Sequence, residues 1–115
     1  MPFANATARV RAMIEAHGGQ DAILRRLGNS PPDDVALVVK VDDVDDIPIG
    51  GGVQQFRRTV IASNLEISTA SWPGPPRRGD LVLISSGTKT LTVQKVDTKV
   101  LNGVRIMHVM TTLGS

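Results

Sequence analysis

The sequence predicts a mainly β protein: a small β-barrel or β-sandwich with one short N-terminal helix and a long mobile loop. Apolar and polar residues alternate in several short runs, most clearly over residues 34–41. Runs of this kind recur at intervals of roughly ten residues and are separated by Gly, Pro and Asn turn signals, which is typical of small barrels and sandwiches. One stretch, residues 42–52, interrupts the pattern with charges, a proline and three consecutive glycines.

Size and composition limit the possible classes of protein. At 115 residues and 12.3 kDa, the chain is expected to form a single domain over residues 1–115. Its aromatic residues are Phe3, Phe56 and Trp72, so the core must be aliphatic and base-stacking surfaces are hard to build. The absence of cysteine excludes disulfides and thiolate metal sites. We expect no classical secretion signal and no membrane partner, because no apolar run approaches the ~20 residues of a membrane helix.

The charges are distributed unevenly along the chain. Residues 29–55 carry one lysine against six aspartates, whereas residues 56–115 carry eight Lys or Arg against three acidic residues. A negative middle and a positive end favour contact between complementary subunits over binding of a single polyanion. The alternative interpretation is an ordinary solvated charged surface.

A helix is predicted from a cap at Asn5 or Thr7 to about His17. Met13 and Ile14 belong to its apolar stripe, and two glycines follow its end. A helix of this length does not persist alone in water, so it must dock on another surface. That surface is either the protein's own sheet or a neighbouring subunit.

The remaining pattern predicts strands and turns. The expected strands are residues 22–27, 34–41, 53–62, a short one near 65–67, 81–85, 90–96, 98–101 and 104–112. Residues 71–80 contain three prolines and two glycines, so no regular structure is expected there. Asn102-Gly103 is the strongest turn signal, since both residues tolerate the positive φ of a type I′ turn. Gly79 supplies a second tight turn, which explains the Arg78-Gly79-Asp80 triplet.

The interrupting stretch is the candidate functional segment. It comprises Asp42, Asp43, Asp45, Asp46, Ile47, Pro48, Ile49, Gly50, Gly51 and Gly52. A proline without a donor and three glycines that are costly to order make a packed strand unfavourable, so we expect a long mobile loop. The carboxylates are suitable ligands for a hard cation, but their spacing is not that of a calcium loop. We therefore expect no metal.

The sequence offers little support for catalysis. His17 and His108 are its two histidines, and each lies among apolar residues, which favours a packed or interface role. The chain contains no glycine-rich phosphate loop, nucleophile elbow or paired-histidine metal motif. We expect a protein that is not an enzyme and has no cofactor.

Two arginine pairs are candidates for contacts with other molecules. Arg57 and Arg58 form the first pair, and Arg77 and Arg78 form the second. Either pair is suited to an inter-subunit or phosphate contact. Without interleaved aromatic residues, the expected contact with DNA is non-specific and electrostatic.

The order of several segments resembles a known family. MIEAHGG is followed by AILRRLG, then by FRRTVIASNLEI, a proline-rich turn, RRGDLVLISSGTKTLTVQKV and NGVRIMHVMTTLG. This order resembles that of the head–tail connector proteins of long-tailed bacteriophages, also called head-closure, stopper or head–tail joining proteins. The resemblance covers residues 8–113, and its most specific part is Gly79-Asp80 at the entry to an apolar strand.

The resemblance implies a structural protein of the virion neck, present in the host bacterial cytoplasm during assembly. It implies a six- or twelve-fold homo-oligomeric ring that joins the head to the tail. Its partners are then a portal or adaptor protein on the head side and a tail or tail-terminator protein on the tail side, with non-specific contact with packaged DNA. The loop over residues 42–55 is expected to help close the DNA exit channel. The alternatives are a tail-terminator or tail-completion protein, and a stand-alone small β-barrel that binds nucleic acid.

Overall fold

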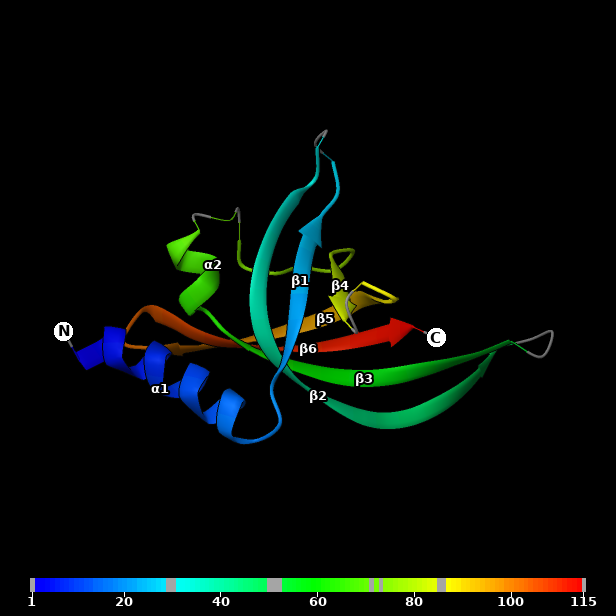
Figure 1. Cartoon of the computed structure of the whole chain (residues 1–115), viewed down its shortest axis with the longest axis horizontal. Coiled ribbons are helices and arrows are strands. Elements are labelled where there is room, and N and C mark those ends of the chain that lie inside the picture. Colours follow the sequence, from blue (N-terminus) through cyan, green and yellow to red (C-terminus); the bar gives the residue numbers. More distant parts are fainter. Residues whose placement is uncertain are drawn as a thin grey trace.

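The computed structural model describes residues 2–28, 31–49, 53–70, 72, 74–84 and 87–114, with side chains from residue 6 onward except over 43–49 and 53–55. Figure 1 shows the two helices and six strands of this part of the chain. They are α1 (Pro2–Ala16), β1 (Gln20–Arg26), β2 (Asp33–Ile49), β3 (Val53–Ser63), α2 (Leu65–Thr69), β4 (Leu81–Ile84), β5 (Lys89–Leu101) and β6 (Val104–Gly114).

The strands form a closed antiparallel barrel in the order β1-β2-β3-β6-β5-β4. β1 closes it, because β1 pairs with β2 along its whole length and with β4 through Ile23, Leu24 and Arg25. The mainly β fold class predicted from the sequence is therefore confirmed, and closure decides between the barrel and the open sandwich.

Alternate residues of the strands fill the barrel with aliphatic side chains. The buried residues of this core are Ala22, Leu24, Val35, Leu37, Val39, Val60, Ala62, Ile67, Trp72, Val82, Ile84, Leu91, Val93 and Met110. Every strand contributes to the set, and burial of one large aliphatic side chain contributes about 2 kcal/mol. Trp72 is the single aromatic member.

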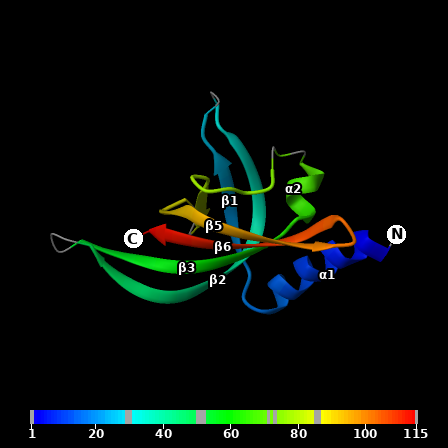
Figure 2. The ribbon, with the colours of Figure 1, turned by 180° about the vertical axis from the view of Figure 1, so that it is seen from behind.

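Helix α1 packs against β2, β3 and β6 of its own barrel, as Figures 1 and 2 show from opposite sides. Ile14 is buried in this contact, and a Cβ on Gly19 would lie 2.8 Å from both the Ile14 carbonyl oxygen and Val38 Cγ1. The docking of this helix on its own sheet is thus confirmed. The predicted stripe is wrong at Met13, which is 48 % exposed, because the buried face runs through Thr7 and Ile14.

Two local predictions need correction. Residues 65–69 form helix α2 and not a short strand. The chain leaves the sheet at Ser63, whose hydroxyl accepts the backbone N–H of Leu65, and a five-residue alternation is too short to distinguish the two structures. Residues 89–101 form one continuous strand and not two, with register shifts that absorb the irregular pattern.

The proline-rich segment before β4 is fixed by a buried ion pair. The Arg26 guanidinium donates to both carboxylate oxygens of Asp80 at 3.0 and 2.8 Å, donates to the Pro75 carbonyl at 2.8 Å and stacks 4.4 Å from the Trp72 ring centroid. Asp80 also accepts the backbone N–H of Arg77 at 2.8 Å. The predicted turn is present, since Gly79 has a φ of 94°.

Replacing Asp80 by Asn is expected to lower the free energy of unfolding by about 3 kcal/mol, because the Arg26 cation stays buried without its counter-charge. Urea unfolding followed by circular dichroism measures the change. Asp97→Asn is the matched control: Asp97 pairs with Lys99 at the exposed surface, so its loss should leave the free energy of unfolding almost unchanged. Equal effects of the two substitutions would contradict the structural role of the buried pair.

Candidate functional site

Strands β2 and β3 continue past the barrel as a two-stranded ribbon, at the right of Figure 1. β1 accompanies β2 only as far as Val39, and β6 accompanies β3 only as far as Phe56. Beyond Phe56, the paired residues of the ribbon have no further strand beside them in the part of the chain that is described. We call residues 42–49 and 53–57 the arm.

The arm corrects the loop prediction. Residues 42–49 belong to β2, and the ladder continues to the pair Ile49 and Val53; Gly50, Gly51 and Gly52 lie outside the described residues. Carboxylates and a proline disfavour a central strand, but they are what open edges carry. The register also places Asp43 opposite Arg58 and Asp45 opposite Arg57, and opposite charges across an antiparallel pair stabilise it.

Of the predicted carboxylates, Asp42 is exposed, and its Oδ1 lies 3.5 Å from Lys40 Nζ. For the other members of the stretch, the structure gives backbone positions only: Asp43, Asp45, Asp46, Ile47, Pro48 and Ile49. Among the side chains that are described, no group of three or more His, Cys, Asp or Glu is arranged to hold a metal ion. Three of the four carboxylates of the acidic stretch, those of Asp43, Asp45 and Asp46, lie outside that set.

The first arginine pair is divided between surface and interior. Arg57 is exposed, but Arg58 is only 6 % exposed, and its guanidinium lies 5.2 Å from the centroid of the Phe56 ring. The Arg58 carbonyl accepts the Thr112 hydroxyl at 3.0 Å. Arg58 therefore stabilises the base of the arm and is not available to a phosphate or a neighbouring subunit.

The second pair, Arg77 and Arg78, is exposed on the segment that Asp80 anchors. β3 and β4 are three strands apart in either direction around the barrel, so these arginines and Arg57 do not form one patch. The two aromatic rings whose side chains are described offer no stacking surface, since Trp72 is buried and Phe56 lies under Arg58. This arrangement does not favour nucleic-acid recognition.

The two histidines have different environments. His17 is exposed and its Nδ1 donates to the Met13 carbonyl at 2.8 Å. His108 is fully buried, with Nε2 2.8 Å from Asn64 Oδ1 and Nδ1 2.9 Å from the Thr98 hydroxyl. Burial, assisted by the positive charge of Arg105, lowers the pKa of His108 to about 4. His108 is thus a neutral packing residue at pH 7.

The turn of the β5–β6 hairpin lies at the end of the molecule away from the arm, and it carries exposed apolar side chains that sequence analysis missed. Val100, Leu101 and Val104 are 57 %, 42 % and 39 % exposed, and we call these three residues the hairpin tip. Asn102 and Gly103 between them have φ values of 50° and 80°, which confirms the predicted turn. The available signal was the consecutive Val100-Leu101 pair, which breaks the polar–apolar alternation immediately before the turn.

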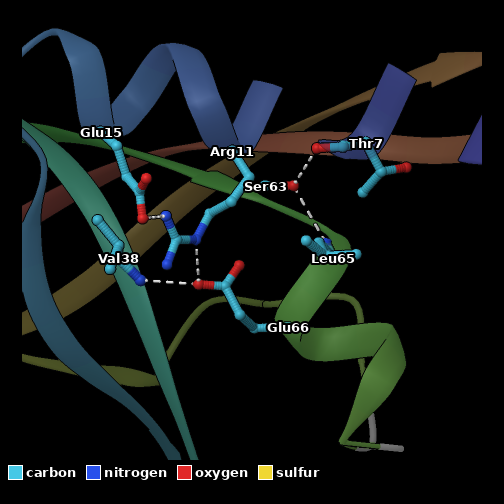
Figure 3. Close-up of polar contacts among 7 residues, drawn as sticks. All are labelled: Thr7, Arg11, Glu15, Val38, Ser63, Leu65 and Glu66. Carbon is cyan, nitrogen blue, oxygen red and sulfur yellow. Dashed lines mark hydrogen bonds and ion pairs between the residues drawn. The ribbon is translucent and has the colours of Figure 1, made fainter. Parts of the chain in front are cut away.

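A second feature missed by sequence analysis joins α1, α2 and β2 (Figure 3). Glu66 Oε2 accepts Arg11 Nε at 2.8 Å and the backbone N–H of Val38 at 2.9 Å, while Arg11 also pairs with Glu15. Val38 needs this acceptor because β3 pairs with β2 only from Val39 onward. The other oxygen, Glu66 Oε1, is buried and has no partner among the described residues.

A pocket of about 530 Å³ lies beside Glu66 on the outer face of β1, β2 and β4. Its lining combines apolar and charged side chains, including Ile23, Ala36, Leu83, Arg11, Asp21 and Glu66. The arrangement suits an apolar group that carries a hydrogen-bond donor, since the charged lining includes two carboxylates and one guanidinium.

None of the described helices is long and apolar enough to cross a membrane. Comparison of the chain with models of protein families finds no match, and comparison with curated proteins finds none.

Acidification from pH 7 to pH 5 is expected to destabilise the protein by about 2 kcal/mol through His108. The folded-state pKa of about 4 lies below the unfolded value of 6.5, so between these two pH values His108 binds a proton in the unfolded chain but not in the folded chain. The stability that neutral His108 contributes is present above pH 6.5 and is lost as the pH falls toward 4. Urea unfolding at several pH values measures this loss. His108→Gln should flatten the dependence between pH 7 and 5, whereas the exposed control His17→Gln should not.

Proposed function

We propose that the protein is a structural component of the neck of a long-tailed bacteriophage, where a ring of copies joins the head to the tail and helps to close the DNA exit channel. The observation that carries the proposal is the arm: one long ribbon, acidic on one strand, that projects beyond a small closed barrel. The segment order described above supports it independently.

The shape of the molecule fits this role. Its extents are 53 × 33 × 25 Å, and the arm lies along the longest axis. A ring of such barrels with their arms directed inward narrows a central channel without any change in the barrels. Because β2 and β3 are paired along the arm, each arm acts as a stiff projection from the barrel wall.

The charge of the arm also fits a DNA channel. The arm contains four aspartates on one strand and one arginine, Arg57, on the other, so it carries an excess of negative charge. Arms gathered in a ring repel the DNA backbone, which lets DNA pass without adhering. The repulsion between arms is screened beyond about 8 Å at physiological salt, so the ring tolerates it.

The ring requires contacts between copies, and the uneven charge provides a basis for them. The acidic arm lies at one end of the molecule, whereas Lys99 and Arg105 lie near the turn of the β5–β6 hairpin at the other end. In the neck, the two faces of the ring meet a portal or adaptor protein on the head side and a tail or tail-terminator protein on the tail side.

A shortened arm tests the role in closure. Replacing residues 47–55 with Asn-Gly keeps the pair Asp46 and Phe56 as the last of the ladder and removes the three outermost pairs of the ladder together with Gly50, Gly51 and Gly52. The melting temperature should change by only a few degrees, while virions carrying the variant should leak DNA or fail to join tails. The measurements are thermal unfolding and the yield of DNA-filled, tailed particles.

The matched control keeps the full arm and replaces Asp43, Asp45 and Asp46 by Asn, which separates charge from length. It should give closed particles through which DNA is ejected more slowly. Normal particle yield with the shortened arm contradicts the closure role. A gene that lies far from portal, capsid and tail genes contradicts the neck assignment as a whole.

A further inference from the structure

We propose that the hairpin tip of one copy docks into the pocket beside Glu66 of a second copy, so that copies of this chain join head to tail. This contact rests on the proposed function in one respect: it would be the contact that joins neighbouring copies in the neck ring. Its physical basis lies in two surfaces that the arm does not include.

The hairpin tip has the properties of a docking element. A single exposed apolar side chain is ordinary, but the end of this hairpin carries three: Leu101 and Val104 are paired on one face, and Val100 lies on the other face, paired with Arg105. The type I′ turn at Asn102-Gly103 fixes the end of the hairpin before any contact forms. Association therefore needs little further ordering of the backbone.

The lining of the pocket is complementary to the hairpin tip. Ile23, Ala36 and Leu83 supply apolar walls on the outer face of the sheet. Asp21 is exposed at the same pocket and forms no ion pair within the described part of the chain. Glu66 Oε1 is buried there without a donor, and a buried carboxylate oxygen left unpaired is costly. The pocket is therefore suited to bind apolar side chains that are accompanied by a cation.

Arg105 supplies that cation. It follows Val104 directly, it is exposed, and no acidic partner is seen for it among the described residues. A guanidinium offers five N–H donors, which suits it to a pair of carboxylates. With the tip in the pocket, Arg105 is placed to pair with Asp21 on the rim.

The partner must be another copy. The tip lies beside the N-terminal part of α1 in both Figure 1 and Figure 2, away from β1 and β4, which carry the pocket walls. The β5–β6 ladder holds it there. Because the two surfaces differ, the contact is heterologous, and such contacts form a ring when the rotation from one copy to the next closes and an open filament when it does not. Three apolar side chains bury less than the ~800 Å² per partner of a stable pair, so single contacts are weak and closure reinforces them.

Sedimentation velocity at protein concentrations from about 10 to 300 µM tests the contact with two variants, each of which lacks one of the two docking surfaces. Leu101→Asp removes the tip, and Ala36→Trp fills the pocket; both positions are exposed, so the fold is expected to persist. The wild-type chain should self-associate as its concentration rises, and each variant alone should remain monomeric. An equimolar mixture should form a dimer and nothing larger, since each variant keeps the surface that the other lacks. Leu27→Asp, at an apolar position 57 % exposed outside both surfaces, is the matched control and should associate as the wild type does.

A wild-type chain that is monomeric throughout, a variant that associates like the wild type, or a mixture that stays monomeric would each overturn the docking contact. These outcomes do not bear on closure of the channel, which the particles with the shortened arm report. Rings that persist in the Leu101→Asp variant would overturn this contact and leave the neck function standing.

Charge reversal identifies the pairing of Arg105. Arg105→Glu should weaken association at least tenfold, and so should Asp21→Arg, because each places like charges together. The two substitutions in one chain should restore most of the affinity, since every contact then pairs Glu with Arg again. Sedimentation equilibrium measures the three affinities. Failure of the double variant to recover would overturn the proposed pairing.

Discussion

Closure of the barrel by two short strands is the constraint on which the rest of the structure depends. β4 has four residues and pairs with β1 through three of them, whereas β2, β3, β5 and β6 are each eleven residues or longer. A barrel closed over so short a span leaves the long strands to extend beyond it. The antiparallel register sends one overhang in each direction: the arm emerges where Phe56 meets Gly114, and the hairpin tip emerges beyond the pair of Ser63 and Met107.

Two carboxylates, the half-buried Glu66 and the buried Asp80, hold the chain where it departs from the sheet. Glu66 accepts the N–H of Val38 and pairs with Arg11 where β3 gives way to α2. Asp80 likewise accepts the N–H of Arg77 and pairs with Arg26 where the proline-rich segment enters β4. In each case one side chain satisfies a backbone donor and neutralises an arginine, which is the arrangement that makes a buried charge tolerable. Breaking either pair leaves the backbone N–H without this acceptor and removes one carboxylate from the arginine, although Arg11 keeps Glu15 and Arg26 keeps the Pro75 carbonyl.

The two ends of the molecule have different surfaces, and the proposed role depends on this difference. The acidic ribbon and the apolar tip extend from the same barrel in opposite directions. In the proposed ring, one end would act at the channel while the other would bind a neighbouring copy. The barrel then serves as a rigid body that couples the two.

The sequence by itself determined the features that depend on neighbouring residues. Alternation predicted most of the strands, Asn102-Gly103 and Gly79 predicted their turns, and the spacing of apolar residues predicted the first helix. The predicted cap at Asn5 or Thr7 is wrong, because the helix begins at Pro2 and contains both residues. These signals are local, because backbone conformation at a turn and the two faces of a strand are set within a few residues.

Only the tertiary structure decided the features that depend on pairing between distant segments. The acidic stretch is a strand because residues 53–58 lie beside it, and Arg58 is buried because Phe56 and β6 surround it. Likewise, α2 is a helix because the chain leaves β3 at Ser63, and the pocket exists only where β1, β2, β4 and α2 converge. Long-range pairing outweighs local propensity at these sites, since a charged or proline-containing segment gains more from a partnered edge than it loses in intrinsic preference.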